Sequence, residues 1–166
     1  MSLSSVGESG MPVFDFRFTV DAPVAAVSAF HFEPGILKIL TPPLMIMRVH
    51  QFEPLAEESI ADFTMWMGPI PVRWQAVHSN VSASGFTDTQ TSGPMKSWIH
   101  THSFAARNEN TTEVHEHIVF EHFGGLRGIW SRILFPRFAL LALFTMRKLI
   151  TRREVRRRMA QRSDHS

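Results

Sequence analysis

The chain has 166 residues, 44% of them hydrophobic, which is enough for a single domain with a sizeable core. It contains no cysteine, and this excludes disulfides, thiolate catalysis and cysteine-ligated zinc. Residues 1–10 lack the basic start and apolar run of a secretory signal, so we expect a cytoplasmic protein.

The net charge of +2 is unevenly distributed along the chain. Residues 1–125 hold 6 Lys and Arg against 13 Asp and Glu, whereas residues 126–166 hold 11 against 2. An acidic body with a basic C-terminal segment indicates self-complementarity or an anionic partner, such as transient contact with an acidic membrane surface. A nucleic-acid partner is not expected, because no aromatic side chains interleave with the basic cluster at 152–162.

The first 43 residues predict a strand followed by two short helices. Residues 11–20 are strand-like, and Asp21, two residues before Pro23, is expected to cap the first helix. Pro34-Gly35 ends that helix, and residues 36–40 form a second helical turn that ends at 41–43. Residues 1–10 and 163–166 are expected to be flexible.

Residues 44–121 predict six consecutive strands joined by short turns, which implies an antiparallel meander. The strands are expected at 44–53, 58–67, 71–82, 86–91, 96–106 and 112–121. After Gly124-Gly125 the apolar spacing becomes helical from Leu126 to about Arg162, with a kink expected at Pro136 and an apolar stripe largely complete by Ile150. Its apolar run at 138–146 is about half of the ~20 residues that span a bilayer, so we expect a buried or interfacial helix.

The segment 86–104 is the most informative part of the sequence. Its bulky or functional side chains recur with a period of two: Phe86, Asp88, Gln90, Trp98, His100, His102 and Phe104. On two extended strands joined at Ser92-Gly93-Pro94 these side chains share one face, while the small hydroxylated residues between them face water. An aromatic wall that carries a carboxylate and two imidazoles is typical of a ligand cavity.

Two His-x-His pairs, at 100–102 and 115–117, could together form a metal site if all four rings shared a face. That register would expose Val114, Ile118 and Phe120 and would bury charged side chains instead. We therefore expect the other register, which pairs Phe104 with Val114 and leaves His115 and His117 in solvent. It predicts no metal, and no cofactor is expected.

The same register places acid and imidazole groups opposite each other on the cavity wall. His102 is expected to pair with Glu116 and Asp88 with His100, while Gln90 lies beside Trp98. Buried carboxylates are tolerated when they are paired, and such pairs often mark functional sites. A purely structural network that contacts no ligand explains the pattern equally well.

The element order and the run F-x-D-x-Q-x-x-G-P-x-x-x-W-x-H-x-H-x-F at 86–104 resemble those of the SRPBCC superfamily, which includes START, Bet v 1-like and polyketide cyclase-like proteins. Leu40-Thr41-Pro42-Pro43, Gly68-Pro69 and Trp74 resemble its bacterial ligand-binding branch, as do Val114, Glu116 and Phe120. The segment at 122–125 departs from the pattern, where a proline-containing turn is expected. The resemblance covers roughly residues 11–145 and implies an α+β helix-grip fold, with a single domain expected over residues 11–162. This fold has about seven antiparallel strands curved around a long C-terminal helix, with two short helices after strand 1.

The resemblance also implies that the cavity binds a hydrophobic small molecule or a lipid. The residues expected to line it are Trp66, Trp74, Phe86, Asp88, Gln90, Trp98, His100, His102, Phe104, Glu116, Ile118 and Phe120. Three hypotheses remain: a carrier, a cyclase or dehydratase that uses His100, His102, Asp88 or Glu116, and an interaction module that docks through the basic helix. Acyl-enzyme chemistry is not expected, because no serine lies in a G-x-S-x-G context.

Overall fold

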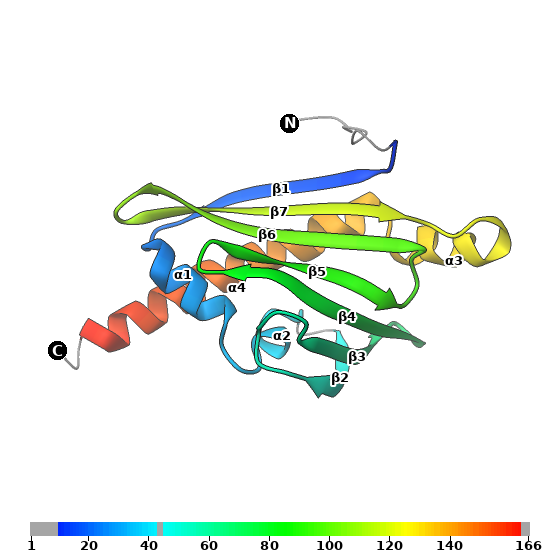
Figure 1. Cartoon of the computed structure of the whole chain (residues 1–166), viewed down its shortest axis with the longest axis horizontal. Helices are drawn as coiled ribbons and strands as arrows, with labels where there is room; N and C mark the ends of the chain where they lie inside the picture. The colour runs from blue at the N-terminus through cyan, green and yellow to red at the C-terminus, as the bar shows by residue number, and fades with distance from the viewer. Residues whose placement is uncertain (1–9, 43–44, 164–166) are drawn as a thin grey trace.

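Seven antiparallel strands curve around a long C-terminal helix in the computed structural model, which describes residues 10–42 and 45–163 (Figure 1). The strand order is β1-β7-β6-β5-β4-β3-β2, so only the first strand leaves the meander to pair with the last. The helix-grip fold expected from the sequence is confirmed. No helix within the described residues is long and apolar enough to cross a bilayer.

The strands begin and end within two residues of their predicted positions. The elements are β1 (Val13–Val20), α1 (Val24–His31), α2 (Ile36–Ile39), β2 (Ile46–Phe52), β3 (Ile60–Met67), β4 (Ile70–Ser82), β5 (Gly85–Ser92), β6 (Ser97–Asn108), β7 (Thr111–Glu121), α3 (Gly125–Leu134) and α4 (Arg137–Ser163). The predicted start of β2 at Leu44 lies outside the described residues. The flexible ends expected at 1–10 and 163–166 also lie outside them, except for residue 10 and for Ser163, which ends α4.

The predicted register of the central strands is also confirmed. His102 lies opposite Glu116 and Asp88 lies opposite His100. Val114 and Ile118 are fully buried, which explains why a one-residue slip is excluded. Thr87 was expected on a wetted face but is buried beside Thr101 on the neighbouring strand.

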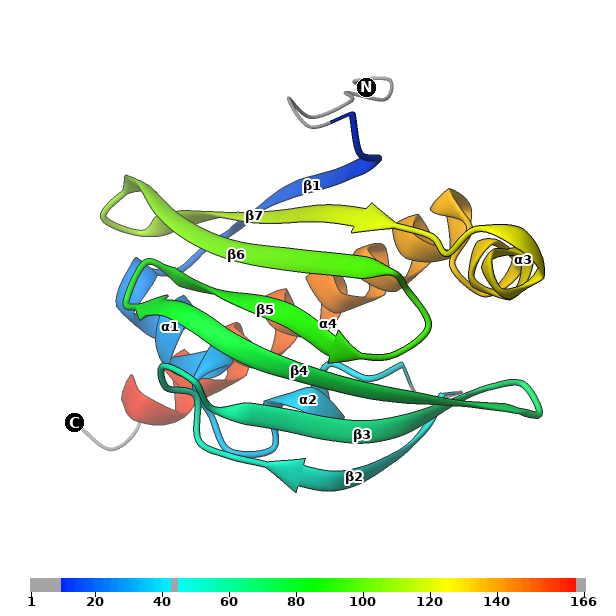
Figure 2. The ribbon, with the colours of Figure 1, turned by 45° about the vertical axis from the view of Figure 1, so that its right-hand side comes forward.

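Two features of the helices differ from the prediction. Pro23, not Asp21, is the N-cap of α1, and its carbonyl accepts hydrogen bonds from the backbone N–H groups of Ala26 and Val27. The single helix kinked at Pro136 is instead two helices. Pro136 has no N–H, so α3 ends at Leu134 and α4 starts in a new direction (Figure 2).

The C-terminal turns of α4 belong to the core, contrary to the expectation that the apolar stripe is largely complete by Ile150. Val155 is 1% exposed and packs with side chains of α1 and β1. Arg158 donates two hydrogen bonds of 2.6 Å to the carboxylate of Glu33. The basic end of α4 is therefore held against α1.

Candidate functional site

A cavity of about 320 Å³ lies between the sheet and α4, within the range of small-molecule sites in proteins. Its wall comes from α2, from β2 to β6 and from the first turns of α4. Most of the lining side chains are apolar, among them Leu37, Met47, Phe63, Met65, Trp74, Trp98, Leu140 and Leu143.

About half of the predicted lining residues are on this wall: Trp74, Phe86, Asp88, Trp98, His100 and His102. The others, which are Trp66, Gln90, Phe104, Glu116, Ile118 and Phe120, are not. On β3 the alternate residues Phe63 and Met65 face the cavity, so Trp66 points to the opposite face of the sheet. The expectation that Trp66 lines the cavity is therefore not met.

The remaining departures have local causes. The Gln90 amide braces the β5–β6 turn, where its Nε2 donates a 2.8 Å hydrogen bond to the carbonyl of Met95. Phe104 packs against the imidazole of His31, with ring centroids 4.7 Å apart. Phe120 packs against Trp98, with ring centroids 5.8 Å apart, and Ile118 is fully buried in the core.

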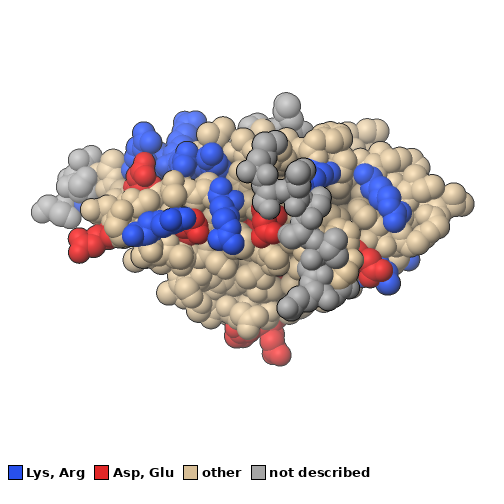
Figure 3. Space-filling view, turned by 90° about the horizontal axis from the view of Figure 1, so that it is seen from above, with Lys and Arg blue, Asp and Glu red and all other residues tan. Residues whose placement is uncertain are grey.

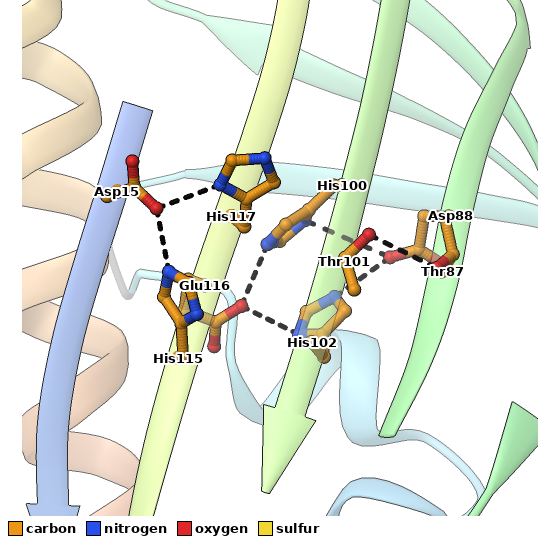
Figure 4. A network of polar contacts seen from close by, with 9 residues as sticks. All are labelled: Asp15, Thr87, Asp88, His100, Thr101, His102, His115, Glu116 and His117. Atoms are coloured by element: carbon orange, nitrogen blue, oxygen red, sulfur yellow. Dashed lines mark hydrogen bonds and ion pairs between the residues drawn. The ribbon is translucent and has the colours of Figure 1, made fainter. Parts of the chain in front are cut away.

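Glu116 and Asp88 are joined by imidazoles in one buried network (Figure 4). Glu116 Oε2 lies 2.8 Å from His100 Nε2 and 2.7 Å from His102 Nδ1. The first contact has hydrogen-bond geometry; the second is a close ion contact without it, so His102 Nδ1 has no hydrogen-bond partner in the described chain. Glu116 therefore supports the cavity wall from behind two lining histidines.

Asp88 forms the other end of the network. Its Oδ2 accepts a 3.0 Å hydrogen bond from His102 Nε2, and its Oδ1 lies 2.9 Å from His78 Nε2. The expected pairing of Asp88 with His100 is present as a longer ion contact, with His100 Nδ1 3.9 Å from Asp88 Oδ2. The pairs opposite in register are thus in contact, and two further hydrogen bonds run diagonally, from His102 to Asp88 and from His100 to Glu116.

Five polar lining residues, His31, Glu33, Thr41, His78 and Arg147, were not predicted to line the cavity. His78 lies opposite Asp88 in the β4–β5 ladder, so extending the register across the Ser84-Gly85 turn would have found it. Arg147 follows Leu140 and Phe144 at helical spacing and hence shares their buried face. His31 carries no comparable signal in the sequence.

The network separates the protonation states of its imidazoles. Burial alone would lower the pKa of His102, but the charges of Glu116 and Asp88 outweigh it and raise that pKa to about 9. Burial and the neighbouring charge of His102 lower the pKa of His100 to about 4. Although burial opposes the charged form, contacts with these imidazoles hold the pKa values of Asp88 and Glu116 below their usual range.

The pKa values of the other two histidines on the cavity wall are also shifted in opposite directions. Burial lowers the pKa of His31 to about 4. Burial also acts on His78, but the hydrogen bond and charge of Asp88 prevail and raise its pKa. His102 is thus a buried cation, while His31 and His100 stay neutral near neutral pH.

A second cluster lies on the opposite face of the sheet, because residues 115 and 117 alternate with Glu116 (Figure 4). Asp15 Oδ1 lies 2.7 Å from His115 Nε2 and 2.8 Å from His117 Nδ1. In this cluster, and in that of Asp88 with His100 and His102, the donor atoms lie within 4.8 Å of one another, as a cation site requires.

No protein-family model matches the sequence, and no curated protein matches it. Solved structures of similar fold include the Zhui aromatase/cyclase from Streptomyces sp. R1128, with 15% identity over 90% of this chain and 96% of that chain and a TM-score of 0.65. Norcoclaurine synthase from Thalictrum flavum has 15% identity over 83% of this chain and 85% of that chain, with a TM-score of 0.59. Ara h 8.0201 has 9% identity over 83% of this chain and 96% of that chain, with a TM-score of 0.57. These Bet v 1-like (SRPBCC) structures confirm the expected resemblance at the level of the fold.

Proposed function

We propose that this protein binds a hydrophobic small molecule or a lipid in the cavity between the sheet and α4, as a carrier or sequestering protein. The observation that carries the proposal is the cavity itself: an apolar space walled by aromatic and aliphatic side chains, with its polar groups gathered around Asp88, His100 and His102. Such a wall holds an apolar body and orients it through a few polar contacts. Norcoclaurine synthase, which shares the fold, was solved in complex with dopamine and hydroxybenzaldehyde.

A cyclase or dehydratase is the alternative use of the same cavity, with His100 or His102 moving a proton while Asp88 or Glu116 orients the ring. Two observations favour carriage. A general acid or base works best with a pKa near the operating pH, whereas the pKa values of His100 and His102 are about 4 and about 9. Glu116 also lies behind the wall, where it contacts the histidines rather than the cavity.

Native mass spectrometry of the protein, purified without detergent, separates these functions. Carriage predicts a stoichiometric apolar species that leaves the protein on denaturation. Catalysis predicts an empty protein that turns over an aromatic or polyketide-like substrate and loses this activity in a His100→Gln variant. An empty protein that neither binds apolar probes nor turns over such substrates would contradict both.

A second function, docking to an anionic membrane surface, is favoured by the outer face of α3 and α4. Large apolar side chains are exposed there at helical spacing: Leu126, Ile129, Trp130, Ile133, Phe138, Leu141 and Leu149. Phe138 is 76% exposed and Leu126 is 83% exposed. An exposed apolar stripe of this extent marks an interaction surface.

Charge supports an acidic membrane as the partner of this face. Residues 126–163 contain 11 Lys and Arg but only Glu154 as an acid. Lys and Arg gather toward the end of the molecule that holds the C-terminal turns of α4 (Figure 3). Four further cations, Arg127, Arg132, Arg137 and Lys148, lie within the apolar segment itself, and this combination fits a membrane with acidic headgroups. The first turns of α4 also wall the cavity, so a membrane bound here would lie beside it.

Vesicle sedimentation tests the docking surface. Vesicles containing phosphatidylglycerol should bind the protein in a salt-sensitive manner, and those of phosphatidylcholine alone should bind it weakly. The double change Trp130→Gln and Phe138→Gln should reduce binding severalfold, whereas Ile99→Gln, an exposed apolar residue on the sheet, should not. Equal binding by all three proteins would remove the membrane function.

A further inference from the structure

Arg147 is the one cation of α4 that lines the cavity. It follows Leu140, Leu143 and Phe144 on the face of the helix turned toward the sheet. Its guanidinium carbon lies 5.3 Å from the centroid of the Phe144 ring, and this ring in turn lies 5.4 Å from that of His100. The guanidinium is therefore placed where the apolar cavity meets the acid–imidazole network.

No described residue accepts a hydrogen bond from the Arg147 side chain, and its Nε is completely buried without a partner. Two other arginines of α4 have hydrogen-bond acceptors within the chain. Arg152 donates to the carbonyl of Thr19, and Arg158 donates to Glu33. A buried Nε without an acceptor is costly, because the hydration that this group loses is not replaced.

The nearby carboxylates do not accept hydrogen bonds from the Arg147 guanidinium. Glu116 contacts His100 and His102, and Asp88 contacts His102 and His78, as described above. Neither carboxylate comes within ion-pair distance of the guanidinium. They act on Arg147 only through their longer-range charges, while burial works against its charged form and lowers its pKa. The donors of Arg147 remain available to a molecule in the cavity.

We propose that Arg147 binds the carboxylate of the ligand, so that the cavity takes an apolar acid rather than a neutral apolar molecule. This inference rests on the proposed function and specifies its ligand class. The planar guanidinium matches a carboxylate with two parallel hydrogen bonds. A single arginine near two carboxylates suits a monoanion better than a phosphate dianion, since Asp88 and Glu116 would repel the second charge.

Matched acids and esters test the inference by isothermal titration calorimetry. Dodecanoic acid with methyl dodecanoate represents an aliphatic ligand, and 2-naphthoic acid with methyl 2-naphthoate represents an aromatic one. The protein should bind the acid of at least one pair about tenfold or more tightly than its ester. Arg147→Met, which keeps the length but removes the charge, should abolish that preference by weakening the binding of the acid about tenfold or more.

Arg153→Met is the control, because Arg153 is exposed on the same helix and should keep the full preference for the acid. Arg147→Met should fold and melt no lower than the parent, since it removes an unpaired buried charge. Equal binding of acid and ester, or a preference that survives Arg147→Met, would overturn the carboxylate site while apolar binding stands. Binding of no acid and no ester would overturn both this site and the proposed function.

Discussion

His100 and His102 lie in contact, with ring centroids 3.9 Å apart, yet they favour opposite protonation states. Both approach the same oxygen of Glu116, and only His102 also receives a hydrogen-bonding carboxylate from Asp88. Two adjacent buried cations would repel each other, so the second carboxylate decides which ring holds the proton. The network is thus a charged pair of carboxylates around one cation, with His78 as an outer partner.

Stability should be greatest near pH 6.5 and should fall on either side. The pKa of His102 is raised from 6.5 to about 9, so its contribution is complete below pH 6.5 and is lost as the pH rises through 9. The pKa values of His31 and His100 are lowered to about 4, so stability also falls as the pH drops from 6.5 through 4. Asp88 and Glu116 add to this loss of stability at low pH, because their pKa values are lowered in the folded protein.

Urea unfolding at a series of pH values measures the loss of stability on both sides of pH 6.5. Between pH 6.5 and 9 the free energy of unfolding should fall by on the order of 3 kcal/mol through His102. His102→Asn should flatten most of this alkaline limb and leave the part that His78 contributes. A stability that stays constant from pH 6.5 to 9 would contradict the assignment of the buried cation.

Glu116 and His102 should be energetically coupled. Glu116→Leu leaves His102 as a buried cation with one carboxylate, and it should cost about 1 to 3 kcal/mol or more. Changing both residues to leucine should cost less than the sum of the single changes. Glu113→Leu on the same strand, where the partners are exposed arginines, should have a much smaller effect. Additive losses at Glu116 and His102 would show that the contact contributes nothing.

Neither acid–histidine cluster is expected to hold a stoichiometric metal. A cation at Asp88, His100 and His102 would have to displace the proton that His102 holds with a pKa of about 9. The outer cluster of Asp15, His115 and His117 offers three ligands at a partly exposed surface. Elemental analysis of protein purified without an affinity tag should find far less than one zinc, nickel or iron per chain. One metal per chain would overturn this.

At the scale of the elements, strands were more predictable than helix ends. Burying one face constrains a strand to a period of two, so the side-chain pattern at 86–120 determined which residues lie opposite each other. The break at Pro136 was harder to predict, because proline can either kink a helix or end it. The buried turn at Val155 was missed because arginines surround it in the sequence.

The site was partly predictable for the same reasons. The register placed Asp88, His100, His102 and Glu116 together, and continuing it to β4 would have added His78. The diagonal contacts could not be predicted, because register determines which side of the sheet a side chain occupies but not its rotamer. Arg147 required knowledge of which face of α4 meets the sheet.

The last turns of α4 should contribute to stability through Val155. Its methyl groups are buried against α1 and β1, so Val155→Ala should lower the free energy of unfolding by about 1 to 3 kcal/mol. Arg153→Ala, exposed two residues earlier, should change it by less than about 0.5 kcal/mol. Chain truncation after Thr151 should therefore destabilise the fold, as thermal unfolding can show. A truncated protein as stable as the parent would contradict this packing.

At the scale of the whole molecule, the sheet and α4 do not fill the space between them. The fold surrounds an apolar cavity and places its charged network at the wall instead of in the closed core. The proposed function therefore depends on one claim: that an apolar ligand binds in this cavity and not on an outer surface.

Filling the cavity tests this claim most directly. Ala139 on α4 lines it, whereas Ala142 on the same helix is exposed, so Ala139→Trp and Ala142→Trp form a matched pair. The neutral fluorescent probe N-phenyl-1-naphthylamine should bind to the parent and to the Ala142 variant with equal affinity. Ala139→Trp should weaken that binding by tenfold or more while the variant remains folded. Equal binding of the probe by the folded Ala139 variant would contradict the claim.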